Sequence, residues 1–381
     1  MKRRGPGARP QRWQAGVRGS IAPAGGPGRG FLELDLRTAE FDYDLPRRLI
    51  AQRPLPERSA SRMLVVDRRA GAWHDSRVAE LPDWLRQGDC LVVNDTRVIP
   101  ARLVGRRLGQ GGEPGGAAEV LLLEPDGDTE GSWRALVRPG RRLRPGSPVV
   151  VAGTRIRVGE RLGDGVRRIN FERGPGFCVE RFAGDHGEVP LPPYIRRDAE
   201  ESDEERYQTA FAARPGSVAA PTAGLHFDIP LLRRLEAKGV GLAKITLHVG
   251  LGTFRPVGTE RVEDHRMHSE RFEVTGEAAE AIGRAGRTVA VGTTCVRTLE
   301  TAAARGGGSV SAMYGNTDLF IRPGHKFLAV DALLTNFHLP RSTLLMLVAA
   351  FAGKDLVLDA YSHAVREEYR FYSYGDCMLL L

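Results

Sequence analysis

The clearest hydrophobic pattern, over Ser217–Pro256, predicts a strand, a helix and a second strand, with a loop after each strand. The apolar run Val218–Ala220 gives the first strand, and Leu242–Val249 gives the second. Between them we expect a helix over Asp228–Lys238, because Asp228 suits the N-cap, a proline follows in the first turn, and a glycine lies just past the end. Two strands joined through a helix should lie parallel.

Four loops that follow predicted strands should line one crevice, because ligands bind at the carboxyl ends of strands in an open parallel sheet. These loops are Pro221–Phe227, His248–Phe254, Gly292–Thr298 and Asn336–Thr343. Threonines and glycines that permit a close approach lie in the first two, namely Thr222, Gly224, Gly250 and Thr253. Histidines lie in three of the four, namely His226, His248 and His338.

The loop Gly292–Thr298 has the character of an anion site. It follows a predicted strand and opens a helix, so free backbone N–H groups and the positive helix end can receive a carboxylate or a phosphate. The residues expected to bind there are Gly292, Thr293, Thr294 and Arg297. A plain helix cap is the alternative for this loop, and a hydrogen-bonded structural role is the alternative for each histidine taken singly.

The rest of the pattern divides the chain into two regions of different character. From residue 63 to about residue 182, short β-rich runs separated by Gly, Pro and Asp turns predict a small barrel. After it, helices and strands alternate. The expected fold class is therefore α/β: an open α/β/α domain formed by residues 31–62 and 183–381, with a small β-barrel domain over residues 63–182 inserted into it.

Composition changes this picture mainly at the N-terminus. Residues 1–30 hold seven Lys and Arg, no acid, eight Gly and four Pro, so they supply all but +1 of the net charge of +8. They predict a disordered basic Gly/Pro-rich tail, for which an RNA-contacting arm and an extension without a role both remain open. Any nucleic-acid surface on the folded part must then be a local patch.

Several classes of protein and site are not expected. No apolar run reaches the roughly 18 residues of a membrane span. The four scattered cysteines suit reduced thiols in a cytoplasmic protein. His265 and His268 could share a helical face, but they lack a nearby ligand pattern, so we expect no metal. On the predicted barrel, a basic segment could hold phosphates or form a solvated rim; it contains Arg141, Arg142 and Arg144.

Ten motifs together resemble the family of S-adenosylmethionine:tRNA ribosyltransferase-isomerases of queuosine synthesis. They occur in family order and span about Leu36 to Met378. The motifs are Pro54–Ser59, Asn94–Arg102, Pro190–Ile195, Tyr207–Thr209, Ala219–Phe227, Thr246–Gly250, Asp264–Glu270, Val291–Thr294, Thr335–Pro340 and Tyr369–Asp376. Two features depart from the family pattern: the N-terminal tail, and Cys295, where a small residue such as Ser is expected.

The resemblance implies an α/β domain with an inserted β-barrel, and it implies the reaction. The ribosyl part of S-adenosylmethionine would move onto 7-aminomethyl-7-deazaguanine at the tRNA wobble position and rearrange to an epoxycyclopentane, releasing adenine and methionine. S-adenosylmethionine is then a co-substrate and tRNA the partner, with no metal, membrane or obligate protein partner, in the cytoplasm.

This reaction gives the candidate residues their expected roles. A sulfonium acidifies the neighbouring ribose carbon, so a base is needed there, and adenine needs a proton donor. His226 or His248 is the expected base, and His338 the expected acid or purine contact. The wobble base should lie near Tyr194, Tyr207 and Gln208. Two other functions remain open: an S-adenosylmethionine-dependent RNA methyltransferase, although no Gly-rich methyltransferase loop is present, and a non-catalytic RNA-binding module.

Overall fold

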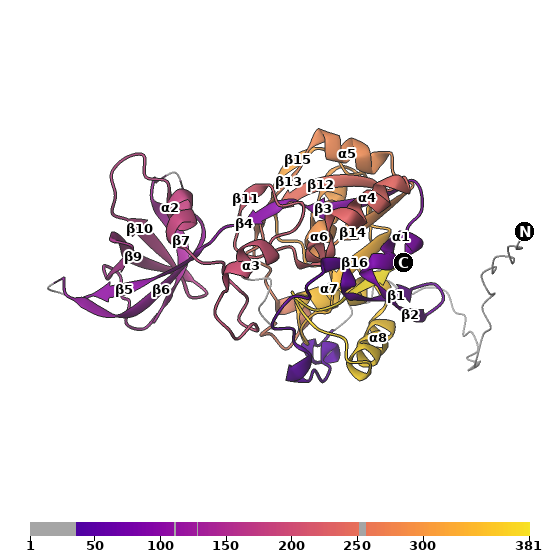
Figure 1. The fold of residues 1–381 in the computed structure, drawn as a ribbon, viewed down its shortest axis with the longest axis horizontal. Helices are drawn as coiled ribbons and strands as arrows, with labels where there is room; N and C mark the ends of the chain where they lie inside the picture. Colours follow the sequence, from indigo (N-terminus) through magenta and orange to yellow (C-terminus); the bar gives the residue numbers. More distant parts are fainter. Residues whose placement is uncertain (1–35, 110–111, 128, 251–256) are drawn as a thin grey trace, which may run out of the picture. The chain divides into compact units, whose positions relative to one another are not determined.

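A computed structural model describes residues 36–109, 112–127, 129–250 and 257–381. The predicted tail over residues 1–30 lies outside these residues. The described chain is a mixed α/β protein (Figure 1). Its strands form a nine-stranded sheet, a closed six-stranded barrel and a separate two-stranded sheet. Within the described ranges, no helix is both long and apolar enough to cross a bilayer.

The nine-stranded sheet is parallel at its centre, where β12, β3, β14 and β16 lie side by side. Antiparallel pairs occur between β16 and β17, between β1 and β2, and along β12, β13 and β15. The spatial order is β15 (Met313–Thr317), β13 (Glu270–Val274), β12 (Gly241–Leu247), β3 (Asp89–Asn94), β14 (Arg287–Val291), β16 (Ala332–Asn336), β17 (Cys377–Leu380), β1 (Arg62–Asp67) and β2 (Ala72–Arg77).

Side chains of this sheet alternate between two hydrophobic cores, one on each face. In β1, Met63 and Val65 belong to one core, whereas Leu64 and Val66 belong to the other. This two-residue period is that of a strand buried on both faces. The first core includes residues of α1 (Leu81–Trp84) and α4 (Ile229–Ala237). The second includes residues of α5 (Gly276–Gly283), α6 (Thr293–Arg305), α7 (Thr343–Ala352) and α8 (Lys354–Arg366).

The barrel has its own core, which contains side chains such as Leu103, Val120, Ile156 and, from helix α2 (Val179–His186), Phe182. Alternation along each strand sends one side chain inward and the next outward. In spatial order the barrel strands are β10 (Val166–Phe171), β7 (Ser132–Arg138), β6 (Pro114–Pro125), β5 (Arg102–Leu108), β8 (Pro148–Val151) and β9 (Thr154–Gly163).

Two strands that the sequence pattern assigned to the barrel belong to the nine-stranded sheet instead. Met63–Val66 lies in β1 and Cys90–Val93 lies in β3, the central parallel strand. All six residues of β3 are buried. A short apolar run of this kind is equally compatible with a barrel and with a doubly covered sheet, because periodicity alone does not separate them.

The opening pattern was right in its helix and second strand and wrong in its first strand. Asp228 caps α4 by accepting the backbone N–H of Leu231 at 2.9 Å, and β12 forms the second strand. Val218–Ala220 is not a strand, because the pairing of the preceding strand ends at Ser217. Its three side chains are buried in three separate cores. The strand just before it, β11 (Arg214–Ser217), pairs with β4 (Thr96–Val98) in the two-stranded sheet.

Candidate active site

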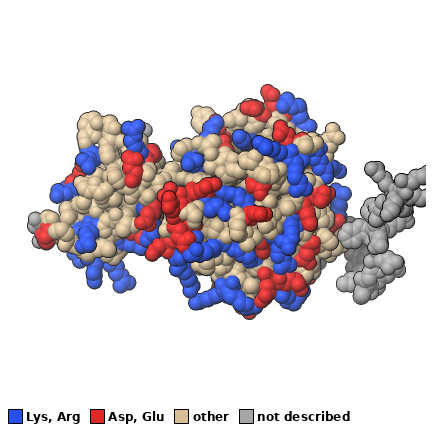
Figure 2. Space-filling view, viewed as in Figure 1, with Lys and Arg blue, Asp and Glu red and all other residues tan. Residues whose placement is uncertain are grey.

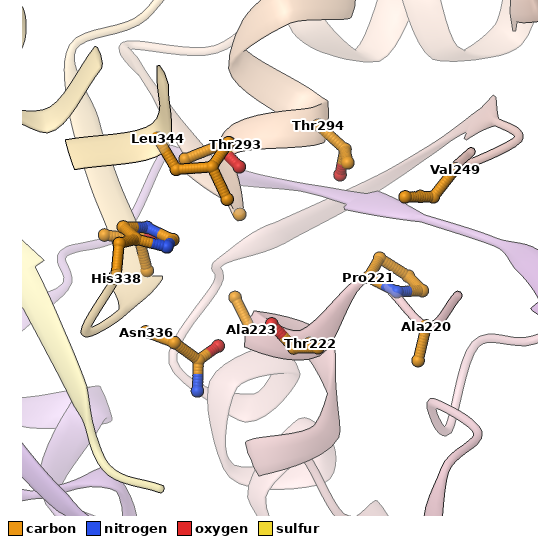
Figure 3. Close-up of a pocket in the computed structure, with 12 residues that line it drawn as sticks. Ala220, Pro221, Thr222, Ala223, Val249, Thr293, Thr294, Asn336, His338 and Leu344 are labelled. Carbon is orange, nitrogen blue, oxygen red and sulfur yellow. The ribbon is translucent and has the colours of Figure 1, made fainter. Parts of the chain in front are cut away.

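The four predicted loops meet at one pocket (Figure 3). Three of these loops follow the central strands β12, β14 and β16, and the loop Pro221–Phe227 follows Ala220. Leu251–Phe254, which includes Thr253, lies outside the described residues. The residues that line the pocket are Ala220, Pro221, Thr222, Ala223, Val249, Gly292, Thr293, Thr294, Thr335, Asn336, His338 and Leu344.

One wall of the pocket is the N-terminus of α6. Gly292 has φ +89°, in the left-handed region that favours glycine, and a Cβ there would lie 3.4 Å from the Cβ of Ala223. Thr293 and Thr294 follow as the first residues of the helix and line the pocket. The Gly292 N–H donates to the carbonyl of Leu334 at 2.7 Å, and the Cys295 N–H donates to the carbonyl of Gly292 at 3.1 Å. The N–H groups of Thr293 and Thr294 therefore make this wall suited to an anion.

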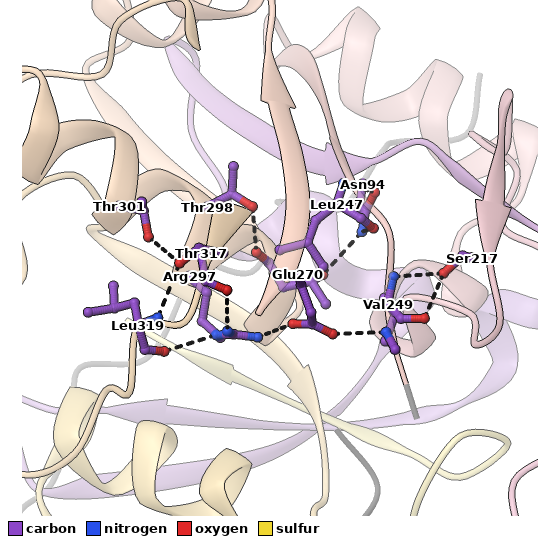
Figure 4. Close-up of polar contacts among 12 residues, drawn as sticks. Asn94, Ser217, Leu247, Val249, Glu270, Arg297, Thr298, Thr301, Thr317 and Leu319 are labelled. Atoms are coloured by element: carbon purple, nitrogen blue, oxygen red, sulfur yellow. Dashed lines mark hydrogen bonds and ion pairs between the residues drawn. The ribbon is translucent and has the colours of Figure 1, made fainter. Parts of the chain in front are cut away.

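Arg297 does not line this pocket. It is almost fully buried and forms an ion pair with Glu270, whose side chain is also only 5% exposed (Figure 4). The guanidinium also donates to the carbonyl oxygens of Leu319 at 3.0 Å and Thr317 at 3.3 Å. The expectation that Arg297 contacts a ligand anion is therefore not met, because its donors are used inside the protein.

The loop after β12 is held by three polar side chains that the sequence pattern did not single out (Figure 4). Asn94 donates to the carbonyl of Leu247 at 2.9 Å and accepts its N–H at 3.1 Å. Ser217 Oγ accepts the N–H of Val249 at 2.8 Å, and Glu270 Oε1 accepts the N–H of Gly250 at 2.9 Å. Asn94 and Glu270 lie within two of the motifs that resemble the family, and this position was the signal by which the sequence could have identified them.

His338 is the one predicted histidine among the residues lining this pocket. Its Nε2 lies 2.8 Å from Thr335 Oγ1. Its backbone is fixed by two tyrosines, since Tyr361 Oη accepts its N–H at 3.0 Å and Tyr43 Oη donates to its carbonyl at 2.5 Å. Burial lowers the pKa of His338 to about 3, so the ring is neutral at pH 7.

His226 lies behind the pocket wall in the 3₁₀ helix η5 (Thr222–His226). Its Nε2 is 3.1 Å from Asn336 Nδ2. An amide NH₂ can only donate, so Nε2 is an acceptor and the ring proton lies on Nδ1. Burial, with Arg58 and Arg370 nearby, lowers the pKa of His226 to about 4.

His248 is half-buried at the end of β12, one residue before the pocket-lining Val249. Its Nδ1 lies 2.9 Å from Thr96 Oγ1, and a Cβ at Gly216 would come within 2.9 Å of the ring. Burial and the charges of Arg271 and Arg214 lower the pKa of His248 to about 4.

Of the predicted loop residues, Thr222 lines the pocket, whereas Gly224 and Gly250 do not.

The residues predicted to contact the wobble base do not line this pocket. Tyr194 stacks on Tyr372 with ring centres 4.5 Å apart, and Tyr207 is fully buried. Gln208 follows α3 (Glu201–Arg206) and binds both backbone groups of Val98, at 3.0 and 2.8 Å. Gln208 also lines a second, wider pocket of about 1190 Å³ with Arg58 and Arg97 among its residues.

Three predicted arginines share the loop between β7 and β8 and are exposed, namely Arg141, Arg142 and Arg144. Acidic residues of the described part form ion pairs with other barrel arginines, such as Arg134 with Asp126, and with none of these three. Lys and Arg side chains are visible at several places on the barrel in Figure 2.

Cys295 is buried, and burial raises its pKa to about 12, which leaves it an inert thiol.

Comparisons with known proteins agree on one family. A model of the family described as "Queuosine biosynthesis protein" matches residues 38–380. The chain is 51% identical over 359 residues to the S-adenosylmethionine:tRNA ribosyltransferase-isomerase of Solibacter usitatus, covering 91% of this chain and 100% of that protein. It is 53% identical over 350 residues to the protein of the same name from Anaeromyxobacter sp., covering 91% of this chain and 99% of that protein.

A solved structure supports the same conclusion. The crystal structure of S-adenosylmethionine tRNA ribosyltransferase from Thermotoga maritima is similar with a TM-score of 0.50 and 39% identity, covering 90% of this chain and 100% of that one. The family match spans the pocket loops and both ends of the nine-stranded sheet. This chain therefore belongs to the queuosine biosynthesis protein family.

Proposed function

We propose that this protein is an S-adenosylmethionine:tRNA ribosyltransferase-isomerase. It transfers the ribosyl part of S-adenosylmethionine onto 7-aminomethyl-7-deazaguanine at the tRNA wobble position and isomerises it, which gives epoxyqueuosine-tRNA and releases adenine and methionine. The observation that carries the proposal is the convergence of four separate family-matched loops on one pocket that combines a helix N-terminus with a histidine. Relatives about 50% identical over their whole length carry this activity in their names.

S-adenosylmethionine is proposed to bind in this pocket. Its methionine carboxylate would lie at Gly292, Thr293 and Thr294, where the positive end of α6 and its first N–H groups favour an anion. Arg297 supports this binding indirectly, because its ion pair with Glu270 fixes the loop that carries Val249. Thr222 would contact the same ligand from the opposite loop.

The histidines differ in how free they are to move a proton. His338 faces the pocket and is proposed to donate to the departing adenine. His226 already accepts a hydrogen bond at Nε2 from Asn336, so it is better suited to positioning than to proton abstraction. His248 is therefore the proposed base for the ribose carbon next to the sulfonium, with Thr96 holding its Nδ1.

The tRNA is proposed to contact both the barrel and the wide pocket. The barrel strands, β5 to β10, would form a separate domain inserted into an α/β/α domain, and Arg141, Arg142 and Arg144 would hold backbone phosphates. The wobble base would enter the first pocket, where S-adenosylmethionine is proposed to bind, and Gln208 in the wide pocket would contact a nucleotide next to it. Tyr194, stacked on Tyr372, and the buried Tyr207 would act through packing. Because tRNA is the proposed partner, we expect the protein to act in the cytoplasm.

The decisive experiment is a mass spectrum of tRNA that carries the deazaguanine precursor, recorded after incubation with this protein and S-adenosylmethionine. The expected result is the mass of epoxyqueuosine, together with one adenine released per modified tRNA. Transfer of a labelled methyl group to the RNA would instead show a methyltransferase. Binding of tRNA without adenine release would show a non-catalytic RNA-binding module. Either outcome would overturn the proposal.

The roles of the histidines can be tested with the same assay. Replacing His338 and His248 separately with Gln should each reduce adenine release by about 10²-fold or more, the usual contribution of a general acid or base. The matched change at His363 should leave the rate unaltered, because that histidine lies on α8 against Asp75. Unchanged rates in the His338 and His248 variants would remove these side chains as proton donors or acceptors.

A further inference from the structure

Asn336 carries an unused hydrogen-bond acceptor at the pocket. The residue is 2% exposed, and its Oδ1 has no hydrogen-bond partner among the described residues. A buried amide oxygen without a partner costs free energy, so its retention at a pocket wall points to a ligand that donates to it. Figure 3 shows the Asn336 side chain on the same side of the pocket as His338.

The orientation of the Asn336 amide is fixed by chemistry. Its Nδ2 lies 3.1 Å from the carbonyl oxygen of Tyr372 and 3.4 Å from that of Asp376. Carbonyl oxygens can only accept, so the NH₂ group must face them and Oδ1 must occupy the other position. The NH₂ group has two hydrogens for three neighbours, and the two nearer ones, the carbonyl of Tyr372 and Nε2 of neutral His226, both lie at 3.1 Å.

The two carbonyls are presented by a tight turn near the C-terminus. Tyr372 has φ +70°, an unfavourable conformation for a residue with a Cβ. A Cβ at Gly375 would meet the carbonyl oxygen of Arg370 at 2.5 Å, so only glycine fits there. Asp376 closes the turn by accepting the N–H groups of Arg62 and Arg370 at 2.9 and 2.8 Å. The motif Tyr369–Asp376 thus acts as the holder of the Asn336 amide.

His338 can supply a donor next to this acceptor. When Thr335 donates its hydroxyl proton to Nε2, the ring proton lies on Nδ1. The loop then offers one acceptor and one donor from residues two positions apart, both lining the same pocket. Adenine presents the complementary pair on one edge, with the N6 amino group as donor and N7 as acceptor.

We propose that Asn336 and His338 form the adenine subsite, in which Asn336 Oδ1 accepts from the N6 amino group and His338 donates to N7. This inference rests on the proposed function, since it names the part of S-adenosylmethionine that each side chain reads. The donor to N7 draws electron density from the bond that joins adenine to ribose, which favours departure of the base. Asn336 makes the site specific for a 6-amino purine.

The α-ammonium of the methionine part is the competing donor for Asn336 Oδ1. None of the described lining residues is Asp or Glu, and the positive end of α6 forms another wall of the same pocket. A cation is disfavoured in such surroundings, whereas the neutral amino group of adenine is not. The charge distribution of the pocket therefore favours adenine as the partner of Asn336.

The test uses the intact wild-type protein with S-adenosylmethionine and three analogues, so that no variant has to fold. One analogue carries a 6-oxo base, one a 7-deaza base, and one lacks the α-amino group. Calorimetry gives the Kd of each, and chromatography gives the rate of base release. We expect the 6-oxo analogue to bind roughly 10- to 100-fold more weakly, because two acceptors would face each other. The 7-deaza analogue should lose base release, and the analogue without the amino group should lose the least affinity.

A pair of variants adds a second readout. Asn336→Ala should bind the 6-amino and 6-oxo compounds with Kd values within about threefold of each other, whereas Asn316→Ala, an exposed change on β15, should keep the wild-type preference. If the wild-type protein binds both base analogues as tightly as S-adenosylmethionine and still forms the tRNA product, the adenine subsite is overturned and the proposed function stands. A loss confined to the analogue without the amino group would overturn it too, because Asn336 would then face the amino-acid end. Absence of any tRNA product from S-adenosylmethionine itself would reject the proposed function and this inference together.

Discussion

The buried ion pair between Arg297 and Glu270 makes a sharp prediction about both stability and binding. Glu270→Ala leaves the Arg297 guanidinium in the core, where the carbonyl oxygens of Leu319 and Thr317 are its remaining acceptors among the described residues. It also removes the acceptor of the Gly250 N–H. The perturbation therefore acts on a helix of the pocket, α6, and on the loop that carries Val249.

The expected magnitude follows from burial. Breaking a buried ion pair by removing one partner costs about 3–5 kcal/mol, and the lost hydrogen bond to Gly250 adds about 1 kcal/mol. The control is Glu280→Ala on α5, where the pair with Arg284 leaves both side chains 73% exposed. That pair should contribute at most about 0.5 kcal/mol.

Urea unfolding followed by fluorescence gives the free energy of unfolding of each variant by linear extrapolation. Glu270→Ala should also raise the KM for S-adenosylmethionine, because the pocket wall loses its support, while Glu280→Ala should leave it unchanged. The double variant Arg297→Met, Glu270→Leu should recover much of the lost stability, since no unpaired charge remains. The reasoning would be refuted if Glu270→Ala and Glu280→Ala unfolded with the same free energy.

Three further predictions follow from the structure. Burial lowers the pKa of His226 to about 4 and of His338 to about 3. Below pH 6.5 the unfolded chain therefore binds more protons than the folded one, and acidification from pH 7 to pH 5 should cost about 2 kcal/mol of folding free energy for each histidine. In urea titrations at several pH values, His338→Gln should remove the share of this pH dependence that His338 contributes. Gly375→Ala should destabilise by more than 2 kcal/mol because its Cβ would overlap the backbone, an order of magnitude taken from strained or overpacked sites, whereas Gly184→Ala, in open space on α2, should cost nothing measurable by thermal unfolding. Filter binding at several salt concentrations gives the slope of log K for tRNA against log salt concentration. Changing the exposed Arg141, Arg142 and Arg144 together to Ala should reduce the magnitude of this slope by roughly 2–3. Changing the ion-paired Arg134, Arg157 and Arg168 together should reduce it less.

Sequence pattern located the elements whose chemistry is local. Helix α4 begins at its predicted cap, Asp228, and the second strand of the opening pattern, predicted over Leu242–Val249, is β12 (Gly241–Leu247), because each is a continuous run between clear turn signals. The pattern missed β13 and β15, whose side chains alternate between buried and exposed and include several polar residues. Such antiparallel strands toward a sheet edge gain their stability from pairing, which no local window contains.

The meeting of three of the four loops could be predicted, because the carboxyl ends of the parallel strands β12, β14 and β16 share one edge of a sheet. The first loop, Pro221–Phe227, reaches the same pocket although the strand predicted before it does not form. The partners of individual side chains could not. Arg297 looked like a ligand contact from its place at a helix N-terminus, but its partner Glu270 lies on β13, a strand that the pattern did not reveal. Similarly, Asn336 was visible only as part of a loop, since the carbonyls that orient it come from residues 372 and 376.

The low pKa values of the buried histidines suit a substrate that is already cationic. A protonated imidazole in the pocket would repel the sulfonium of S-adenosylmethionine, so burial that keeps His338 neutral favours binding. Removing a proton from the carbon beside the sulfonium moves one positive charge from the substrate to the base without adding charge to the site. Burial opposes uptake of a proton from solvent, because that adds a positive charge to the site. It opposes proton transfer from the bound substrate much less, because that transfer leaves the net charge of the site unchanged. This difference explains how histidines that resist titration by solvent can still exchange protons within the proposed reaction.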